Sequence, residues 1–190
     1  PERYAKVTTR IVGAIDSMTN LIDEVLVLGK VTSGNVAYTP ENLDLVDFCE
    51  KLVEEFNTIQ ADGRSLDLAV DGEACDVWLD AKLLTHSLSN LISNAFKYSK
   101  EKDNPELSIH FKPKELLLSV KDYGIGIPGA EHIHLFEPFF RADNVTEIQG
   151  TGLGLSIAKE YVEVNRGQIS ATSILGEGSC FEITFKKDKL

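Results

Sequence analysis

Two pairs of short apolar segments, separated by long helical stretches, constrain the fold of this chain most. LSIHF (107–111) and LLLSV (116–120) flank a polar stretch and predict a β-hairpin. QISATSI (168–174) and CFEITF (180–185) flank a GEG turn and predict a second pair of strands. Strands that arrive in neighbouring pairs, with long helices between them, favour an α+β fold, an α/β sandwich in which helices cover one face of a mixed sheet.

The remaining predicted elements follow the same scheme. Apolar residues at helical spacing predict helices over 46–59, 80–98 and 152–165. Short strands are expected around 43–45 and over 65–70 and 76–79.

The first segment carries a heptad pattern, which is typical of helices that pack in bundles. The apolar residues that form this seam are Val7, Ile11, Ala14, Met18, Leu21, Val25 and Leu28. The segment 29–40 (GKVTSGNVAYTP) reads as a break after the helix. A helix packed on its own domain is the alternative, but the break favours an intermolecular bundle. We therefore expect one long heptad-patterned helix with its linker (1–36), followed by a separate domain (37–190).

Charge, hydropathy and cysteine spacing argue against a nucleic-acid-binding protein, a membrane-spanning segment and a disulfide or zinc framework. With 19 basic against 30 acidic residues, the net charge of −11 argues against nucleic acid as a partner. No apolar run approaches the roughly 20 residues that span a bilayer. Cys49, Cys75 and Cys180 are widely spaced and form no CxxC motif, which favours a reducing compartment over disulfides or zinc. We expect a cytoplasmic location for this sequence. If it is part of a longer protein, that protein is either soluble or anchored in a membrane.

The stretch NLISNAFKYS (90–99) places polar residues on an otherwise apolar helix. Asn90 and Asn94 are four residues apart and share a face, and an amide oxygen is a hard ligand suited to Mg²⁺. Lys97 offers a charge for phosphate and Tyr98 an aromatic surface. Ordinary solvated side chains on a helix are the alternative interpretation.

The motif KDYGIGIP (121–128) begins where an apolar strand ends. Gly124 and Gly126 allow a sharp turn and close approach to a flat ligand. The carboxylate of Asp122 can accept from the exocyclic amine of adenine, whereas it would meet the guanine carbonyl acceptor to acceptor. Taken alone, such a motif is also a common turn.

A third motif, GTGLGLSIAK (150–159), is a glycine-rich loop that leads directly into a helix. The amides at a helix N-terminus carry partial positive charge, so this loop is suited to wrap a phosphate chain. Just before it, FEPFFR (136–141) is interpreted as an apolar latch ending in a phosphate-binding Arg141, or equally as a plain core cluster.

In combination, these motifs resemble the sensor histidine kinase family, within the ATPase superfamily of gyrase, Hsp90 and MutL. NLISNAFKYS resembles the N box, DYGIGIP the first glycine box, FEPFF the F box and GTGLGL the second glycine box, in the family's order. The resemblance covers residues 41–186, and GEGSCFEITF (176–185) is similar to the family's closing strand.

The resemblance implies a Bergerat-type fold that binds ATP and Mg²⁺ under a lid formed by residues 141–150, which we expect to pack poorly. Asn94 would hold the metal and Asp122 would accept from adenine N6. The residues implied to bind ATP are Asn90, Asn94, Lys97, Tyr98, Asp122, Gly124, Gly126, Phe136, Arg141, Gly150, Thr151, Gly152, Leu153 and Gly154.

The resemblance also gives residues 1–36 a role, as the second helix of the family's dimerisation and histidine phosphotransfer hairpin. His86, His110, His132 and His134 all lie outside the family's H-[ED]-x-[RK]-[TS]-P phosphoacceptor context. We therefore expect the γ-phosphate of ATP to pass to a histidine on a helix upstream of this sequence, and from there to the receiver domain of a response regulator. A weak homodimer through residues 7–28 is also expected. A serine kinase or ATPase of the same superfamily, and a non-catalytic nucleotide-binding regulatory module, are the alternatives.

Overall fold

The computed structural model describes residues 15, 18–19, 21–30, 33–34, 36–146 and 148–187. The chain divides between Val36 and Ala37 into two units, each described by itself. In the first unit, residues 21–30 are helical. Of the predicted seam, Met18, Leu21 and Val25 expose their side chains, whereas Val7, Ile11 and Ala14 lie outside the described residues. The assignment of this segment to a dimerisation hairpin stays a prediction.

The second unit alternates strands and helices. In chain order its elements are β1 (Glu41–Leu43), α2 (Leu45–Ile59), β2 (Asp67–Gly72), β3 (Val77–Leu79), α3 (Ala81–Tyr98), β4 (Glu106–Phe111), β5 (Glu115–Asp122), the 3₁₀ helices η1 (Gly129–His134) and η2 (Asp143–Val145), α4 (Gly154–Val164), β6 (Gln168–Ile174) and β7 (Gly178–Lys186). The sequence predicted every helix and strand of this unit to within two residues, but not the two 3₁₀ helices.

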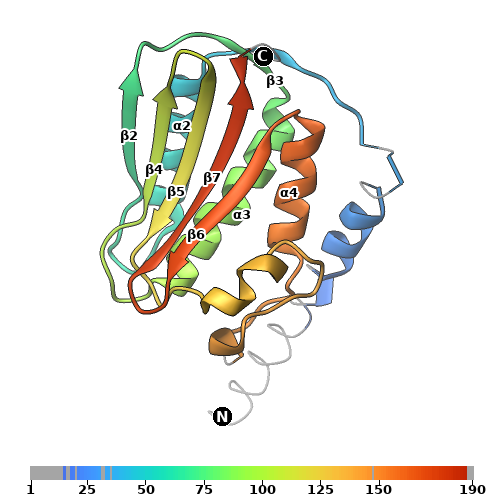
Figure 1. The fold of residues 1–190 in the computed structure, drawn as a ribbon, viewed down its shortest axis with the longest axis vertical. Helices are drawn as coiled ribbons and strands as arrows, with labels where there is room; N and C mark the ends of the chain where they lie inside the picture. The colour runs from blue at the N-terminus through green and yellow to red at the C-terminus, as the bar shows by residue number, and fades with distance from the viewer. Residues whose placement is uncertain are drawn as a thin grey trace, which may run out of the picture. The chain divides into compact units, whose positions relative to one another are not determined.

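Five strands form a mixed sheet in the order β2-β4-β5-β7-β6. β2 pairs with β4 in parallel, and the other neighbours are antiparallel. β1 and β3 form a separate two-stranded ribbon. Helices α2, α3 and α4 lie together behind one face of the sheet (Figure 1). The predicted α+β sandwich is therefore confirmed.

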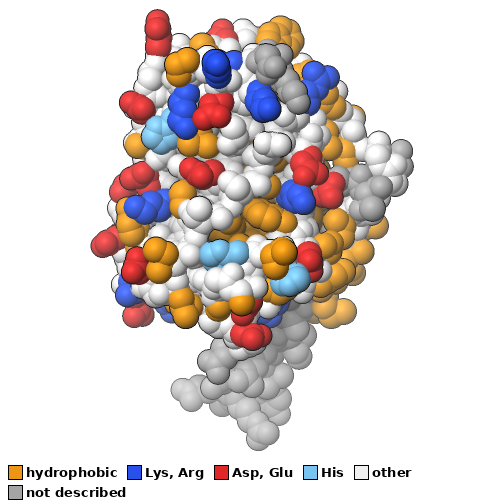
Figure 2. All heavy atoms as spheres, viewed as in Figure 1, with side chains coloured by type: hydrophobic (Ala, Val, Ile, Leu, Met, Phe, Trp, Pro, Cys, Tyr) orange, Lys and Arg blue, Asp and Glu red, His pale blue; other side chains and the backbone are white. Residues whose placement is uncertain are grey.

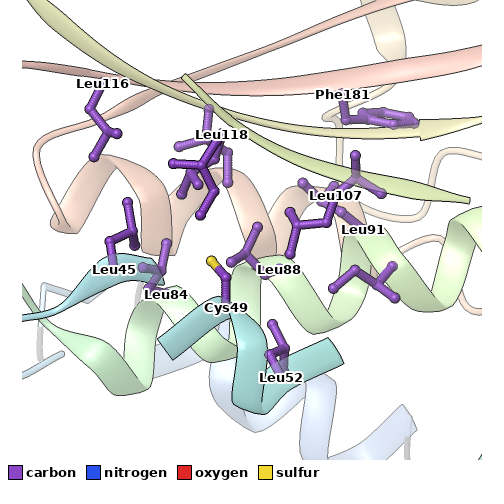
Figure 3. Close-up of a cluster of buried hydrophobic side chains, with 14 of the residues drawn as sticks. Leu45, Cys49, Leu52, Leu84, Leu88, Leu91, Leu107, Leu116, Leu118 and Phe181 are labelled. Atoms are coloured by element: carbon purple, nitrogen blue, oxygen red, sulfur yellow. The ribbon is translucent and has the colours of Figure 1, made fainter. Parts of the chain in front are cut away.

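The hydrophobic core lies between this face and the helices. Strand register aligns buried residues in rows, such as Leu107 opposite Val120 and Val120 opposite Phe181. Side chains from the helices meet these rows from the other side, as Figure 3 shows for Leu88 and Leu91 of α3. Each fully buried leucine contributes about 1.5–3 kcal/mol to the stability of the fold. The apolar residues that the period-two and helical patterns singled out are the ones that form this core.

The opposite face of the sheet is polar. In the view of Figure 2, acidic and basic side chains are interspersed over this face rather than gathered into a patch of one sign. Such a surface needs no second layer of helices, which is consistent with a two-layer sandwich.

Asp80 fixes the start of α3. Its Oδ1 accepts hydrogen bonds from the amides of Lys82 and Leu83 at 3.0 and 3.1 Å, as an N-cap residue does. Its Oδ2 accepts from the amide and hydroxyl of Thr39 at 2.8 and 2.9 Å. The main chain of Asp80 also exchanges two hydrogen bonds with the side-chain amide of Asn165, just after α4. One buried residue thus ties together the two helices that carry the predicted motifs.

Candidate functional site

The polar residues predicted on α3 line its C-terminal half. Asn90, Asn94, Lys97 and Tyr98 are all half-buried. The Nδ2 of Asn90 donates to the carbonyl of His86 at 3.0 Å. Its Oδ1 faces the start of α4, because a Cβ added to Gly154 would lie 2.8 Å from that oxygen. The N box and the second glycine box are therefore adjacent at Asn90.

A second contact joins the end of α3 to the glycine-rich loop. The Nζ of Lys97 lies 4.8 Å from the centroid of the Tyr98 ring. A Cβ added to Gly150 would lie 2.8 Å from this Nζ and 3.8 Å from the Tyr98 hydroxyl. The structure thus brings a lysine ammonium to the beginning of the loop that was predicted to wrap phosphate.

The first glycine box is built into the core. Asp122, at the end of β5, is 5% exposed, and its Oδ1 accepts from the Gly124 amide at 2.8 Å. Burial raises the pKa of this carboxyl, and hydrogen bonds from Gly124 and Ser179 act in the opposite direction. A carboxylate has about four acceptor sites, so these donors leave it capacity to accept from a ligand.

Glycine is required in this box by close backbone contacts. The Ile125 amide donates to the Tyr98 carbonyl at 3.2 Å, and a Cβ on Gly124 would overlap that same carbonyl. Gly126 has φ +63°, and a Cβ there would overlap the carbonyl oxygen of Ile174. The first glycine box therefore packs against the end of α3 on one side and against β6 on the other.

The F box lies partly in the core and partly at the surface. Phe136 is half-buried and packs against the core, whereas Phe139 is 60% exposed and has φ +64°. A Cβ on Gly152 would lie 2.7 Å from both the Phe139 carbonyl carbon and the Phe140 carbonyl oxygen. The F box backbone therefore lies directly against the second glycine box.

Arg141 has a different setting from the expected one. Its Nη2 donates to the carbonyl of Val145 at 2.6 Å and also to the carbonyl of Ile148. Its Nε is buried and has no hydrogen-bond partner among the described residues. In this structure the guanidinium holds the backbone of the lid segment, and its predicted contact with phosphate stays a prediction.

The lid segment packs better than its composition suggested. Ala142 and Val145 are buried, and the Nδ2 of Asn144 donates to the carbonyl of Gly126 at 2.8 Å. The expectation of poor packing is therefore wrong for Ala142 and Val145, whose apolar side chains are buried, whereas Asp143 and Asn144 between them are exposed. Glu147 lies outside the described residues.

The start of α4 has no side-chain cap. Leu153 occupies the N-cap position, and no side chain caps the helix there. The Leu153 amide donates to the Thr151 hydroxyl at 3.3 Å, and Leu153 itself is fully buried. The first amides of this helix, at the positive end of its dipole, therefore lack a side-chain cap and directly follow the loop that carries Gly150.

The histidines form no metal site in the described part of the chain, where no group of three metal-binding side chains occurs. His132 lies 3.3 Å from the Ile127 carbonyl, and His134 lies 2.9 Å from the Glu137 carboxylate. His86 contacts the ring of Tyr161, with 5.5 Å between centroids.

Sequence reasoning missed two polar residues of the site, Ser179 and Asn144. Ser179 reaches Asp122 because β5 and β7 pair in a register that places the two residues opposite each other. Asn144 reaches Gly126 across 18 positions of sequence. Neither contact has a local signal, because both depend on the tertiary arrangement.

The chain is similar to several known proteins. The chain is 34% identical to the sensor histidine kinase WalK of Bacillus subtilis, over 92% of this chain and 30% of WalK. It is 33% identical to the adaptive-response sensory kinase SasA of Crocosphaera subtropica, over 88% of this chain and 44% of SasA. The fold matches full-length ShkA in complex with AMPPNP with a TM-score of 0.80, at 22% identity over 93% of this chain and 37% of ShkA.

The chain spans less than half the length of these two curated relatives. No helix in the described ranges is both long and apolar enough to cross a membrane. Residues 79–189, more than half of the chain, match the family of histidine kinase-, DNA gyrase B- and HSP90-like ATPases. This chain belongs to that family.

Proposed function

We propose that this chain is the ATP-binding catalytic part of a two-component sensor histidine kinase. The observation that carries the proposal is that α3 touches both glycine-rich segments, through Tyr98 at Gly124 and through Lys97 at Gly150. A ligand placed along this end of α3 would meet the buried Asp122 carboxylate at one end and the Lys97 ammonium beside the Gly150 loop at the other. Two relatives of this chain are named as sensor kinases, which supports the same function.

Adenine would lie at Asp122. The carboxylate would accept from the exocyclic amine, while Gly124 and Gly126 let the backbone beside it pack closely against Tyr98 and Ile174. Guanine would place a carbonyl oxygen against the same carboxylate, which disfavours it.

The phosphates would lie between Lys97, the Gly150 loop and the uncapped amides of α4. Among the described residues the side chain of Asn94 makes no hydrogen bond, so its amide oxygen is free to act as a ligand. This fits Mg²⁺, which prefers hard oxygen ligands and keeps several waters. When bound, the ion would neutralise charge on the β- and γ-phosphates. A phosphate contact through Nη2 of Arg141 would require its hydrogen bonds to the lid backbone to break.

The acceptor of the γ-phosphate would be a histidine outside this sequence. The proposed reaction is in-line attack by a neutral imidazole nitrogen on the γ-phosphorus, with ADP as the leaving group. Lys97 would offset the charge that develops on the transferred group. The phosphoryl group would then pass to an aspartate of a response regulator receiver domain.

The first 36 residues would contribute one helix of a dimerisation bundle. Burial of the seam between two such helices gains several kcal/mol at about 25 cal/mol per Å², whereas association costs on the order of 4–15 kcal/mol. We therefore propose a weak homodimer through residues 7–28. Equilibrium sedimentation should show a concentration-dependent dimer that residues 40–190 alone do not form, and a dimer that survives this deletion would contradict the proposal.

Phosphotransfer tests the proposed function directly. The chain would be incubated with γ-labelled ATP and Mg²⁺, with and without a separate protein that carries a histidine-bearing dimerisation hairpin. We expect acid-labile, base-stable label on the hairpin and none on this chain. Acid-stable label would indicate a serine kinase, and nucleotide binding without transfer would indicate a regulatory module; either result would contradict the proposal.

A further inference from the structure

Arg64 is a buried cation outside the motifs and outside the residues that match the family. It lies in the loop between α2 and β2, and its side chain is 10% exposed. A charge so deeply buried is costly unless its donors are satisfied, so its hydrogen-bond partners indicate its role.

Those partners are at the C-terminal end of α3. Nη2 donates to the carbonyl of Phe96 at 2.8 Å. Nη1 donates to the carbonyl and the hydroxyl of Ser99 at 2.8 and 2.9 Å. The guanidinium also lies 5.1 Å from the centroid of the Phe96 ring. Arg64 therefore gives the Phe96 carbonyl a donor at the end of the helix, and it adds a second donor to the Ser99 carbonyl, which also accepts from the Lys102 amide at 3.1 Å. Its positive charge lies at the negative end of the helix dipole.

Asp62 holds the guanidinium in this orientation. Its Oδ2 accepts from Nε and Nη2 of Arg64 at 2.8 and 2.6 Å. These hydrogen bonds, first among several causes, lower the pKa of Asp62 to about 2. The planar fork of arginine is thus fixed on one side by a carboxylate and directed on the other side at two carbonyls, a geometry that lysine cannot reproduce.

The two carbonyls bracket the residues that meet the proposed nucleotide. Lys97 and Tyr98 lie between Phe96 and Ser99, and they carry the contacts with Gly150 and Gly124. The last turn of a helix frays readily when its carbonyls lack partners. A loosened turn would move the ammonium of Lys97 away from the loop.

We propose that Arg64 is a positioning residue for nucleotide binding, which holds the last turn of α3 so that Lys97 stays at the Gly150 loop. The proposal rests on the proposed function, because it takes Lys97 as a phosphate contact. Arg64 itself does not touch the nucleotide and acts through Lys97.

The test is a double-mutant cycle on the whole chain, with ADP and Mg²⁺ as the probe in isothermal titration calorimetry. Arg64→Lys keeps the charge and loses the fork, and we expect it to weaken ADP binding by about tenfold. In the background Lys97→Met the same substitution should weaken binding by less than about twofold, because the side chain through which Arg64 acts is gone.

Asn57→Ala is the matched control for a purely structural effect. Asn57 accepts from the Leu66 amide at 2.6 Å in the same region, but no hydrogen bond connects it with α3. This variant should leave ADP affinity within about twofold of the unaltered chain. If Arg64→Lys fails to fold, Asp62→Asn provides a second variant, because it weakens the hydrogen bonds that hold the guanidinium. We expect Asp62→Asn to weaken ADP binding by about threefold. In the Lys97→Met background, Asp62→Asn should leave ADP binding unchanged.

The outcomes separate the two proposals. Equal ADP affinity of the unaltered chain and the Arg64→Lys chain would overturn the positioning role alone. The positioning role would also be overturned if Arg64→Lys weakened ADP binding by the same factor with and without Lys97→Met, because Arg64 would then not act through Lys97. Absence of ADP binding by the unaltered chain would instead overturn the proposed function.

Discussion

The two ends of the proposed nucleotide site are built in different ways. At the adenine end, Asp122 is buried, and Gly126 lies so close to β6 that a single methyl group would overlap the backbone. At the phosphate end, Gln149 and Gly150 are exposed, and Gly150 meets the tip of the Lys97 side chain rather than backbone. The adenine end is therefore part of the core, whereas the phosphate end begins, at Gly150, with an exposed residue that contacts an adjustable side chain.

Because the two ends are built differently, substitutions at the adenine end should change the stability of the fold as well as nucleotide binding, whereas substitutions at Gly150 should change mainly nucleotide binding. Groups at the adenine end contact the backbone of neighbouring strands, so a change there disturbs the fold as well as the ligand site. At Gly150 of the phosphate end, by contrast, the contact is with the tip of a flexible side chain, which can shift at little cost. Substitutions at the two ends should therefore have measurably different consequences.

The largest effect is expected for Gly126→Ala. The added methyl group would overlap the Ile174 carbonyl in a backbone conformation that alanine rarely adopts, so the free energy of unfolding should fall by about 3 kcal/mol. Gly150→Ala is the matched substitution at the phosphate end, where only the flexible Lys97 tip must move, and its cost should stay below about 1 kcal/mol. Urea denaturation measures both values, and equal costs would remove the distinction between the two ends.

Asp122→Ala should mainly affect base selectivity. The loss of the carboxylate should weaken ADP binding by about 10- to 100-fold, or about 1–3 kcal/mol, and should abolish the preference for ADP over GDP. Titration of both nucleotides against both proteins provides the measurement. A chain that binds ADP and GDP equally before the substitution would exclude Asp122 from the adenine pocket.

Asn94→Ala should affect the metal rather than the fold. Because the Asn94 side chain makes no hydrogen bond among the described residues, the free energy of unfolding should change by less than about 0.5 kcal/mol. The gain in nucleotide affinity that Mg²⁺ provides should fall by about tenfold. Ser93→Ala, an exposed neighbour on α3, serves as the control. If Asn94→Ala left the nucleotide affinity unchanged both with and without Mg²⁺, Asn94 would be an ordinary surface residue of the helix.

The smallest effect concerns Asp80, which ties together α3 and α4, the two helices that carry the phosphate end. Burial raises its pKa, but hydrogen bonds from Thr39, Lys82 and Leu83 outweigh burial and lower the pKa below 3.8. The stabilisation is therefore present above about pH 3.8 and is lost as the pH falls through the folded-state pKa. Asp80→Asn should cost about 1 kcal/mol at pH 7 and progressively less below pH 3.8, as denaturation at several pH values would show. A cost that does not change with pH would contradict this role.

Local patterns made most of the fold predictable. The β4–β5 hairpin follows from alternating apolar residues around a four-residue turn, and α3 follows from helical spacing that begins at the N-cap Asp80. The parallel pairing of Leu68 with Leu107 was not predictable, because nothing in either strand specifies a partner so distant in sequence.

The candidate site shows the same division. The family resemblance supplied Asp122, Lys97 and the glycines, because their motifs are short and contiguous. The partners of Arg141 and the buried position of Arg64 were not predictable, since each depends on backbone carbonyls that only the folded chain brings within reach. Carbonyl acceptors leave no signature in a sequence, because every residue has one.

A crystal structure of the chain with ADP and Mg²⁺ would test the central claim most directly. The account predicts that the exocyclic amine of adenine lies within hydrogen-bond distance of the Asp122 carboxylate, with the diphosphate between Lys97 and the Gly150 loop. Adenine bound away from Asp122, or phosphates bound away from the end of α3, would contradict it.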